Sequence, residues 1–133
     1  MRIRTNVIIL GILFISAYAG NYLGLGDRFW WLDVALHFLG GFFIAVLIRE
    51  YYKSHLEKMA KPVRILFLVA SVALVGLLWE FYEYLVWTFF DRFPQWDLFN
   101  IGFDLPDYFD ALSDLLMDLL GTIALVLLNK KSD

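Results

Sequence analysis

Long apolar runs alternate with short polar links along the whole chain. Four segments, at about residues 5–23, 31–51, 62–90 and 108–129, consist mainly of Leu, Ile, Val, Phe and Ala. Each approaches or exceeds the roughly 20 residues that an α-helix needs to cross the hydrocarbon core of a bilayer. The pattern therefore predicts an all-α, polytopic membrane protein, with four transmembrane helices in one domain covering residues 1–133.

The composition supports the same class of protein. Hydrophobic residues make up 61% of the chain, whereas a soluble domain is about half apolar. The chain has no Cys, which excludes a disulfide framework and a thiolate metal site. The lipid bilayer is the expected partner, and no nucleic-acid partner is expected.

The first apolar segment has two interpretations. Arg2 and Arg4 precede it, and the sequence Ala17-Tyr18-Ala19 resembles a signal-peptidase cleavage site. The apolar run is, however, longer than the roughly 7–15 residues typical of the hydrophobic region of a signal peptide. We therefore favour a first transmembrane helix.

Basic residues are unevenly distributed among the polar segments. The two tails and the second link hold Arg2, Arg4, Arg49, Lys53, Lys58, Lys61, Arg64, Lys130 and Lys131. The other two links hold only Arg28 and Arg92. The positive-inside rule then predicts that both termini are cytoplasmic (N-in and C-in), in a multi-pass protein of the cytoplasmic (inner) membrane.

The third link, residues 91–110, combines acidic and apolar residues. It carries Asp91, Asp97, Asp104, Asp107 and Asp110 among several Phe, Leu and Ile residues and one Trp. We expect an outward-facing amphipathic loop that lies in the membrane interface. It is either a simple anchor, which we favour, or a cover over a site.

Three of the apolar segments contain pairs of ionisable residues at helical spacing. The pairs are Asp33 with His37, Glu80 with Glu83, and Asp114 with Asp118. Residues three or four apart lie on one face of a helix. With a rise of about 1.5 Å per residue, the predicted topology places all three pairs at a similar depth in the outer half of the membrane.

These five carboxylates and one imidazole have no Lys or Arg beside them in the apolar segments, whose only basic residues, Arg49 and Arg64, lie at the ends next to the second link. Uncompensated charges in a medium of low dielectric constant repel one another and are poorly solvated. Either some of the acids hold protons, or a bound cation compensates them. Ionisable residues within a membrane are functional by default, so we favour a metal site formed by all six. The alternatives are a proton or ion pathway and a network of interhelical hydrogen bonds.

The ligand types suit a divalent cation. Carboxylate oxygens favour Mg²⁺, Mn²⁺ or Ca²⁺, and His37 as a ligand would favour Zn²⁺ or Fe²⁺. A metal site in the outer leaflet is compatible with a metal-dependent enzyme of the cell envelope, or one acting on a lipid-linked substrate. No serine nucleophile with a histidine partner and no glycine-rich phosphate loop is evident, so the catalytic residues are unknown.

Two further functional classes remain open. A proton- or cation-coupled transporter or channel needs a polar route to the cytoplasm, but residues 42–48 and 65–75 contain no ionisable side chain. A non-catalytic membrane scaffold needs only a fully paired polar cluster.

Glycines accompany the ionisable residues. Gly40 and Gly41 follow His37, Gly76 precedes Glu80, and Gly121 follows Asp118. Small residues let membrane helices approach closely. We predict that these four glycines are helix-packing positions, within the bundle or across a homodimer.

The three motifs together resemble the VanZ-like family of small membrane proteins and, more closely, the uncharacterised YjdF-type family. They are Asp33-x-x-x-His37-Phe38, Glu80-x-x-Glu83 and Asp114-x-x-x-Asp118-x-x-Gly121, and they span about three quarters of the chain. VanZ-like proteins usually have Gln at the position of Glu83 and Asn at that of Asp118, so this chain is more acidic. The resemblance implies a role in the cell envelope without an established reaction.

Overall fold

The computed structural model describes residues 3–23, 25, 29–94 and 108–129, and within them all regular structure is helical. The helices are α1 (Ile3–Tyr22), α3 (Trp30–Tyr51), α4 (Lys53–Leu56), α5 (Lys61–Arg92) and α6 (Tyr108–Asn129). Among these, α1, α3, α5 and α6 are each long and apolar enough to cross a membrane. The predicted all-α fold with four transmembrane helices is therefore confirmed. Most of the predicted outward loop lies outside the described residues.

Helix α5 is longer than a bilayer crossing requires. Pro62 lies in its first turn, where the missing N–H group of proline costs no hydrogen bond. Its 32 residues correspond to roughly 48 Å at the usual helical rise, whereas the hydrocarbon core is about 30 Å thick. Helix α5 must therefore tilt or extend beyond the hydrocarbon core.

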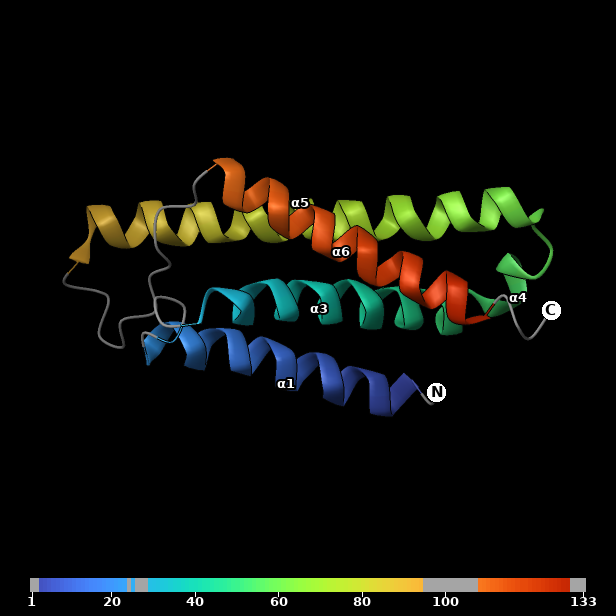
Figure 1. Ribbon diagram of the computed structural model, residues 1–133, viewed down its shortest axis with the longest axis horizontal. Coiled ribbons are helices and arrows are strands. Elements are labelled where there is room, and N and C mark those ends of the chain that lie inside the picture. The colour runs from blue at the N-terminus through green and yellow to red at the C-terminus, as the bar shows by residue number, and fades with distance from the viewer. Residues whose placement is uncertain (1–2, 24, 26–28, 95–107, 130–133) are drawn as a thin grey trace.

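Helix α3 is the central element of the bundle. It contacts α1, α5 and α6, and its contact with α6 is the most extensive of the fold. Figure 1 shows α6 crossing α3 and α5 obliquely, while α1 runs along the opposite side of α3. Helix α1 begins, and α6 ends, toward the end of the bundle that carries α4 (Figure 1). Which end faces the cytoplasm stays a prediction.

Aromatic side chains join α1 to α5. The hydroxyl groups of Tyr18 and Tyr82 are hydrogen-bonded. One turn away, the rings of Phe14 and Trp79 meet edge to face, with centroids 5.7 Å apart. These contacts hold α1 against the bundle on the side away from α6.

The surface of the bundle is apolar, whereas several of its most buried side chains are polar. Large apolar side chains such as Ile15 and Leu66 are 67% exposed. A small apolar core forms around Ala45, Val46, Val72 and Leu125. Among the residues whose burial is described, the buried polar ones are Asn6, His37, Asp114, Asp118 and Thr122. Lipid solvates such an apolar surface, so the polar interior is where a functional site is expected.

Candidate metal centre

Two glycines bring the backbones of α3 and α6 into direct contact. A β-carbon on Gly41 would overlap the backbone of Asp118, and one on Gly121 would lie 2.7 Å from the backbone nitrogen of Phe42. Only glycine, which has no β-carbon, fits at both positions. This approach places the acidic face of α6 directly opposite His37 on α3.

His37 lies among three carboxylates. Its Nε2 atom is 3.8 Å from Asp33 Oδ1 and 3.8 Å from Asp114 Oδ2. Its Nδ1 atom is 3.7 Å from Asp118 Oδ1. His37, Asp114 and Asp118 are buried, whereas the Asp33 side chain is 50% exposed. Nε2 of His37 therefore lies near Asp33 and Asp114, whereas Nδ1 lies near Asp118.

Three of these residues have the geometry of a possible metal site. Asp33, His37 and Asp114 each offer one ligand atom, and these atoms lie within 4.8 Å of one another. Imidazole nitrogen and carboxylate oxygen are common ligands of divalent cations. This group, in which His37 and Asp114 are buried, could therefore hold a metal ion.

The two α5 acids predicted as ligands lie outside this tight group. Glu83 lines the same cavity as Asp33 and His37. One carboxylate oxygen of Glu80, Oε1, is buried and has no hydrogen-bond partner among the described residues. The assignment of all six residues as ligands stays a prediction, because the structure brings only part of the set within ligand spacing.

The Asp118 carboxylate is enclosed by glycines from two neighbouring helices. A β-carbon on Gly76 of α5 would overlap Asp118 Oδ2, and one on Gly40 of α3 would lie 3.9 Å from Asp118 Oδ1. Larger residues at position 76 would displace this carboxylate from its place beside His37. The glycines thus give the carboxylate the room that it needs in the helix interface.

A cavity of about 280 Å³ lies beside His37 and is bounded by α1, α3, α5 and α6. Its polar wall consists of Asp33, His37, Glu83 and Asp118. The apolar part of the wall consists of Leu10, Leu13, Phe14, Ala17, Leu36, Ile44, Val75 and Trp79. The ionisable residues therefore border a cavity whose remaining wall is apolar and could accommodate a hydrocarbon chain.

Two buried polar residues were not identified from the sequence. Asn6 Nδ2 donates a hydrogen bond to the Phe43 carbonyl oxygen at 2.8 Å, which ties α1 to α3. Thr122 Oγ1 donates one to the Asp118 carbonyl oxygen at 3.1 Å. Thr122 is an isolated polar residue in an apolar run, and that exception to the pattern was the available signal. Asn6 follows Arg4 and Thr5 at the start of its segment and gave no such signal.

A family model described as "Predicted membrane protein (DUF2238)" matches residues 1–131. No curated protein and no solved structure matches the chain. The match supports an uncharacterised family of membrane proteins, while the resemblance to VanZ-like and YjdF-type proteins stays a prediction. Because the match covers nearly the whole chain, the protein belongs to the DUF2238 family.

Proposed function

We propose that this member of the DUF2238 family binds a divalent cation inside the membrane, between α3 and α6. The observation that carries the proposal is the spacing of Asp33, His37 and Asp114, whose ligand atoms lie within 4.8 Å of one another. Ligand atoms at about 2.0–2.6 Å from a common ion are themselves roughly 3–4 Å apart. Small side-chain rotations would therefore bring all three into contact with one ion.

Asp118 has a different role in this proposal. It faces Nδ1 of His37, on the opposite side of the ring from Asp33 and Asp114. A ligating histidine commonly uses its second nitrogen to donate to a carboxylate, which fixes the tautomer and the ring orientation. Asp118 would thus hold Nε2 toward the ion.

The mixed nitrogen and oxygen ligands narrow the choice of ion. Imidazole binds Zn²⁺ or Fe²⁺ more readily than Mg²⁺ or Ca²⁺, which prefer oxygen ligands, and Mn²⁺ is compatible with the carboxylates. Glu80 would serve as a further ligand. Its buried Oε1 atom has no hydrogen-bond partner among the described residues, and coordination to a cation would supply the missing interaction. Glu83 lines the cavity beside this group, and in this proposal it would approach the ion from there.

The cavity suggests what such an ion would act on. Its apolar wall is formed largely by side chains of α1, α3 and α5, and its polar wall by the candidate ligands. A lipid-linked substrate could place its chain against the apolar wall and its polar group near His37. A bound ion would act there as a Lewis acid on a carbonyl or phosphoryl oxygen. A metal-dependent enzyme of the cell envelope is therefore our preferred functional class.

A transporter is the second candidate function, but the apolar core of the bundle offers no polar route for an ion. Between the site and the α4 end of the bundle, α3, α5 and α6 pack through the buried residues Ala45, Val46, Val72 and Leu125. An ion crossing this region would lose its ligands in an apolar environment. A non-catalytic scaffold would retain the polar cluster but would not respond to metal.

Thermal unfolding of the purified protein tests the proposal. An ion that binds only the folded state raises the melting temperature, so chelator should lower it and added Zn²⁺ or Mn²⁺ should restore it. Asp114→Asn should remove most of this response. The matched control is Asp91→Asn, which neutralises an exposed acid on α5 outside the site. A melting temperature indifferent to chelator, with Asp114→Asn more stable than the parent, would instead indicate protonated acids without a metal.

A further inference from the structure

The cavity at the candidate metal centre is polar at one end and apolar at the other. Asp33 and Glu83 line the end away from α4, whereas Leu10, Ile44 and Val75 line the end toward α4. Asp33 and Ile44 are eleven residues apart on α3, which corresponds to about 16 Å at the usual helical rise. A molecule lying along the bundle would therefore meet a polar wall at one end and an apolar wall at the other.

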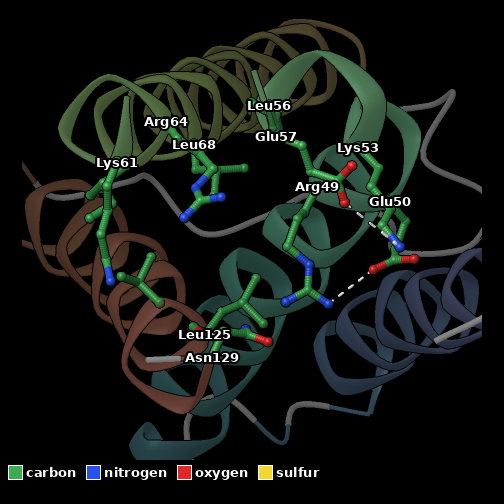
Figure 2. Close-up of a pocket in the computed structure, with 12 residues that line it drawn as sticks. Arg49, Glu50, Lys53, Leu56, Glu57, Lys61, Arg64, Leu68, Leu125 and Asn129 are labelled. Atoms are coloured by element: carbon green, nitrogen blue, oxygen red, sulfur yellow. Dashed lines mark hydrogen bonds and ion pairs between the residues drawn. The ribbon is translucent and has the colours of Figure 1, made fainter. Parts of the chain in front are cut away.

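A second cavity, of about 360 Å³, lies beside α4 and has a different lining. Charged side chains of both signs surround it, and Arg49 Nη2 donates to Glu50 Oε1 at 2.9 Å there (Figure 2). A hydrocarbon chain in this cavity would remove charged groups from water, which is unfavourable. The cavity at the candidate metal centre is the better fit for a lipid chain.

The size of this cavity limits the ligand. Its volume of about 280 Å³ is just below the range of roughly 300–1,000 Å³ that is typical of ligand pockets. One hydrocarbon chain can lie lengthwise in such a space, whereas the two chains of a common phospholipid need a wider one.

The charge of the polar wall limits the head group. Asp33, Glu83 and Asp118 line it together with His37, and no Lys or Arg is among the described lining residues. A divalent ion offsets only part of three ionised carboxylates, so an anionic head group would still meet like charge. The carbonyl oxygen of an uncharged ester or amide can bind to the ion without adding negative charge.

The edge between α1 and α5 is formed by aromatic side chains. Among the described helices, α1 packs extensively only against α3. The rings that join α1 to α5 are those of Phe14, Tyr18, Trp79 and Tyr82. Phe14 and Trp79 line the cavity, while Phe14 and Tyr82 are 48% and 40% exposed. One layer of aromatic side chains therefore separates the cavity from the lipid.

We propose that this cavity binds a lipid with one hydrocarbon chain and an uncharged ester or amide head, which enters from the bilayer between α1 and α5. The inference rests on the proposed function, since the bound ion would hold the carbonyl oxygen. The chain lies against Leu10, Ile44 and Val75 and the head lies beside His37. Rotation of the Phe14 and Trp79 side chains opens the path.

Ligand selection can be measured on the purified full chain in phosphatidylcholine nanodiscs, by native mass spectrometry and melting temperature. The probes are monolauroylglycerol, dilauroylglycerol and lauroyl lysophosphatidic acid, which share one acyl chain type and differ in chain number or head charge. Monolauroylglycerol should be retained and should raise the melting temperature, and the other two should not. Equal retention of dilauroylglycerol, or stronger binding of lysophosphatidic acid, would overturn the proposal.

A matched pair of variants on α1 tests the location. Ala17→Phe adds a ring inside the cavity and should weaken monolauroylglycerol binding about tenfold. Ala19→Phe, at an exposed position that does not line the cavity, should bind like the parent. Equal binding in the two variants would contradict the proposal. If Ala17→Phe does not fold, Leu13→Trp replaces it with the same expectation.

The route of entry can be tested separately, because the chain has no native Cys. Joining the thiols of Tyr18→Cys and Tyr82→Cys with a reducible bifunctional reagent should slow monolauroylglycerol binding, and reduction should restore its rate. An unchanged rate would contradict entry between α1 and α5.

Metal analysis of the same samples separates this proposal from the metal centre. Ala17→Phe and Ala19→Phe should keep the metal content of the parent, because neither residue is a candidate ligand. A parent that holds metal but no monolauroylglycerol would contradict the lipid site alone. A metal-free parent that binds monolauroylglycerol would contradict the metal centre and support the lipid site.

Discussion

Gly41 of α3 and Asp118 of α6 meet at backbone distance, since a β-carbon on Gly41 would lie 2.5 Å from the Asp118 α-carbon. This contact fixes the rotation and height of α6 relative to α3. It therefore decides which carboxylates face His37. Packing and the candidate metal centre depend on the same pair of residues.

Replacing this glycine should destabilise the protein. Gly41→Leu forces a side chain into occupied space, and overpacking of this kind costs about 1–3 kcal/mol. Gly11→Leu is the matched control, because a β-carbon on Gly11 meets nothing within 4 Å. Melting in detergent checks both variants. Equal stability of Gly41→Leu and the parent would show that α3 and α6 do not pack in this way.

Both chain termini should be cytoplasmic. The basic residues of the second link, including Arg49, Lys53 and Arg64, favour that side of the membrane. A reporter active only in the cytoplasm should work when fused after Asp133 and fail when inserted after Pro94. The reverse result would invert the topology and turn the candidate metal centre toward the cytoplasm.

The hydrogen bond between Tyr18 and Tyr82 should contribute to the docking of α1 on α5. Hydrogen bonds between membrane helices contribute about 0.6–2 kcal/mol, so Tyr18→Phe and Tyr82→Phe should each cost an amount in that range. The double variant should cost no more than the larger single effect, because both remove the same bond. Tyr84→Phe, at an exposed position of α5, is the control. Fully additive losses would show that the hydroxyl groups do not interact.

Stabilisation by the metal should depend on pH with a definite sign. Ligands such as His37 and Asp114 must release protons to bind a cation, so the ion-induced rise in melting temperature should be full at neutral pH and shrink as the pH falls. Without an ion, acid should have the opposite effect, because protons relieve repulsion among the carboxylates. Melting curves from pH 8 to pH 5, recorded with and without Zn²⁺, separate the effect of acid on metal binding from its effect on repulsion among the carboxylates. An ion-induced rise in melting temperature that does not change with pH would argue against carboxylate and imidazole ligands.

The fold follows closely from the apolar pattern of the sequence. The segment predicted at 108–129 coincides with α6, and that at 31–51 differs from α3 by one residue at its start. The pattern could not show α4, because four residues within a basic link carry no helical periodicity.

The candidate site could be predicted only in part. Spacing of four residues places Asp33 beside His37 on one helix. Spacing cannot show that His37 faces Asp114 through one ring nitrogen and Asp118 through the other, because this depends on the rotation of α6 against α3. That rotation follows from the contacts of Gly41 and Gly121. The sequence also could not show that Glu80 and Glu83 lie outside the closely spaced group of Asp33, His37 and Asp114.

Elemental analysis of the protein, purified without added chelator, tests the central claim most directly. We predict a divalent transition metal in near-stoichiometric amount in the parent and in the exposed-site control Asp91→Asn. His37→Ala and Asp114→Asn should lose most of it, because both residues contribute ligands to one ion. A metal content that is negligible in the parent, or equal in all four proteins, would contradict the proposed metal centre.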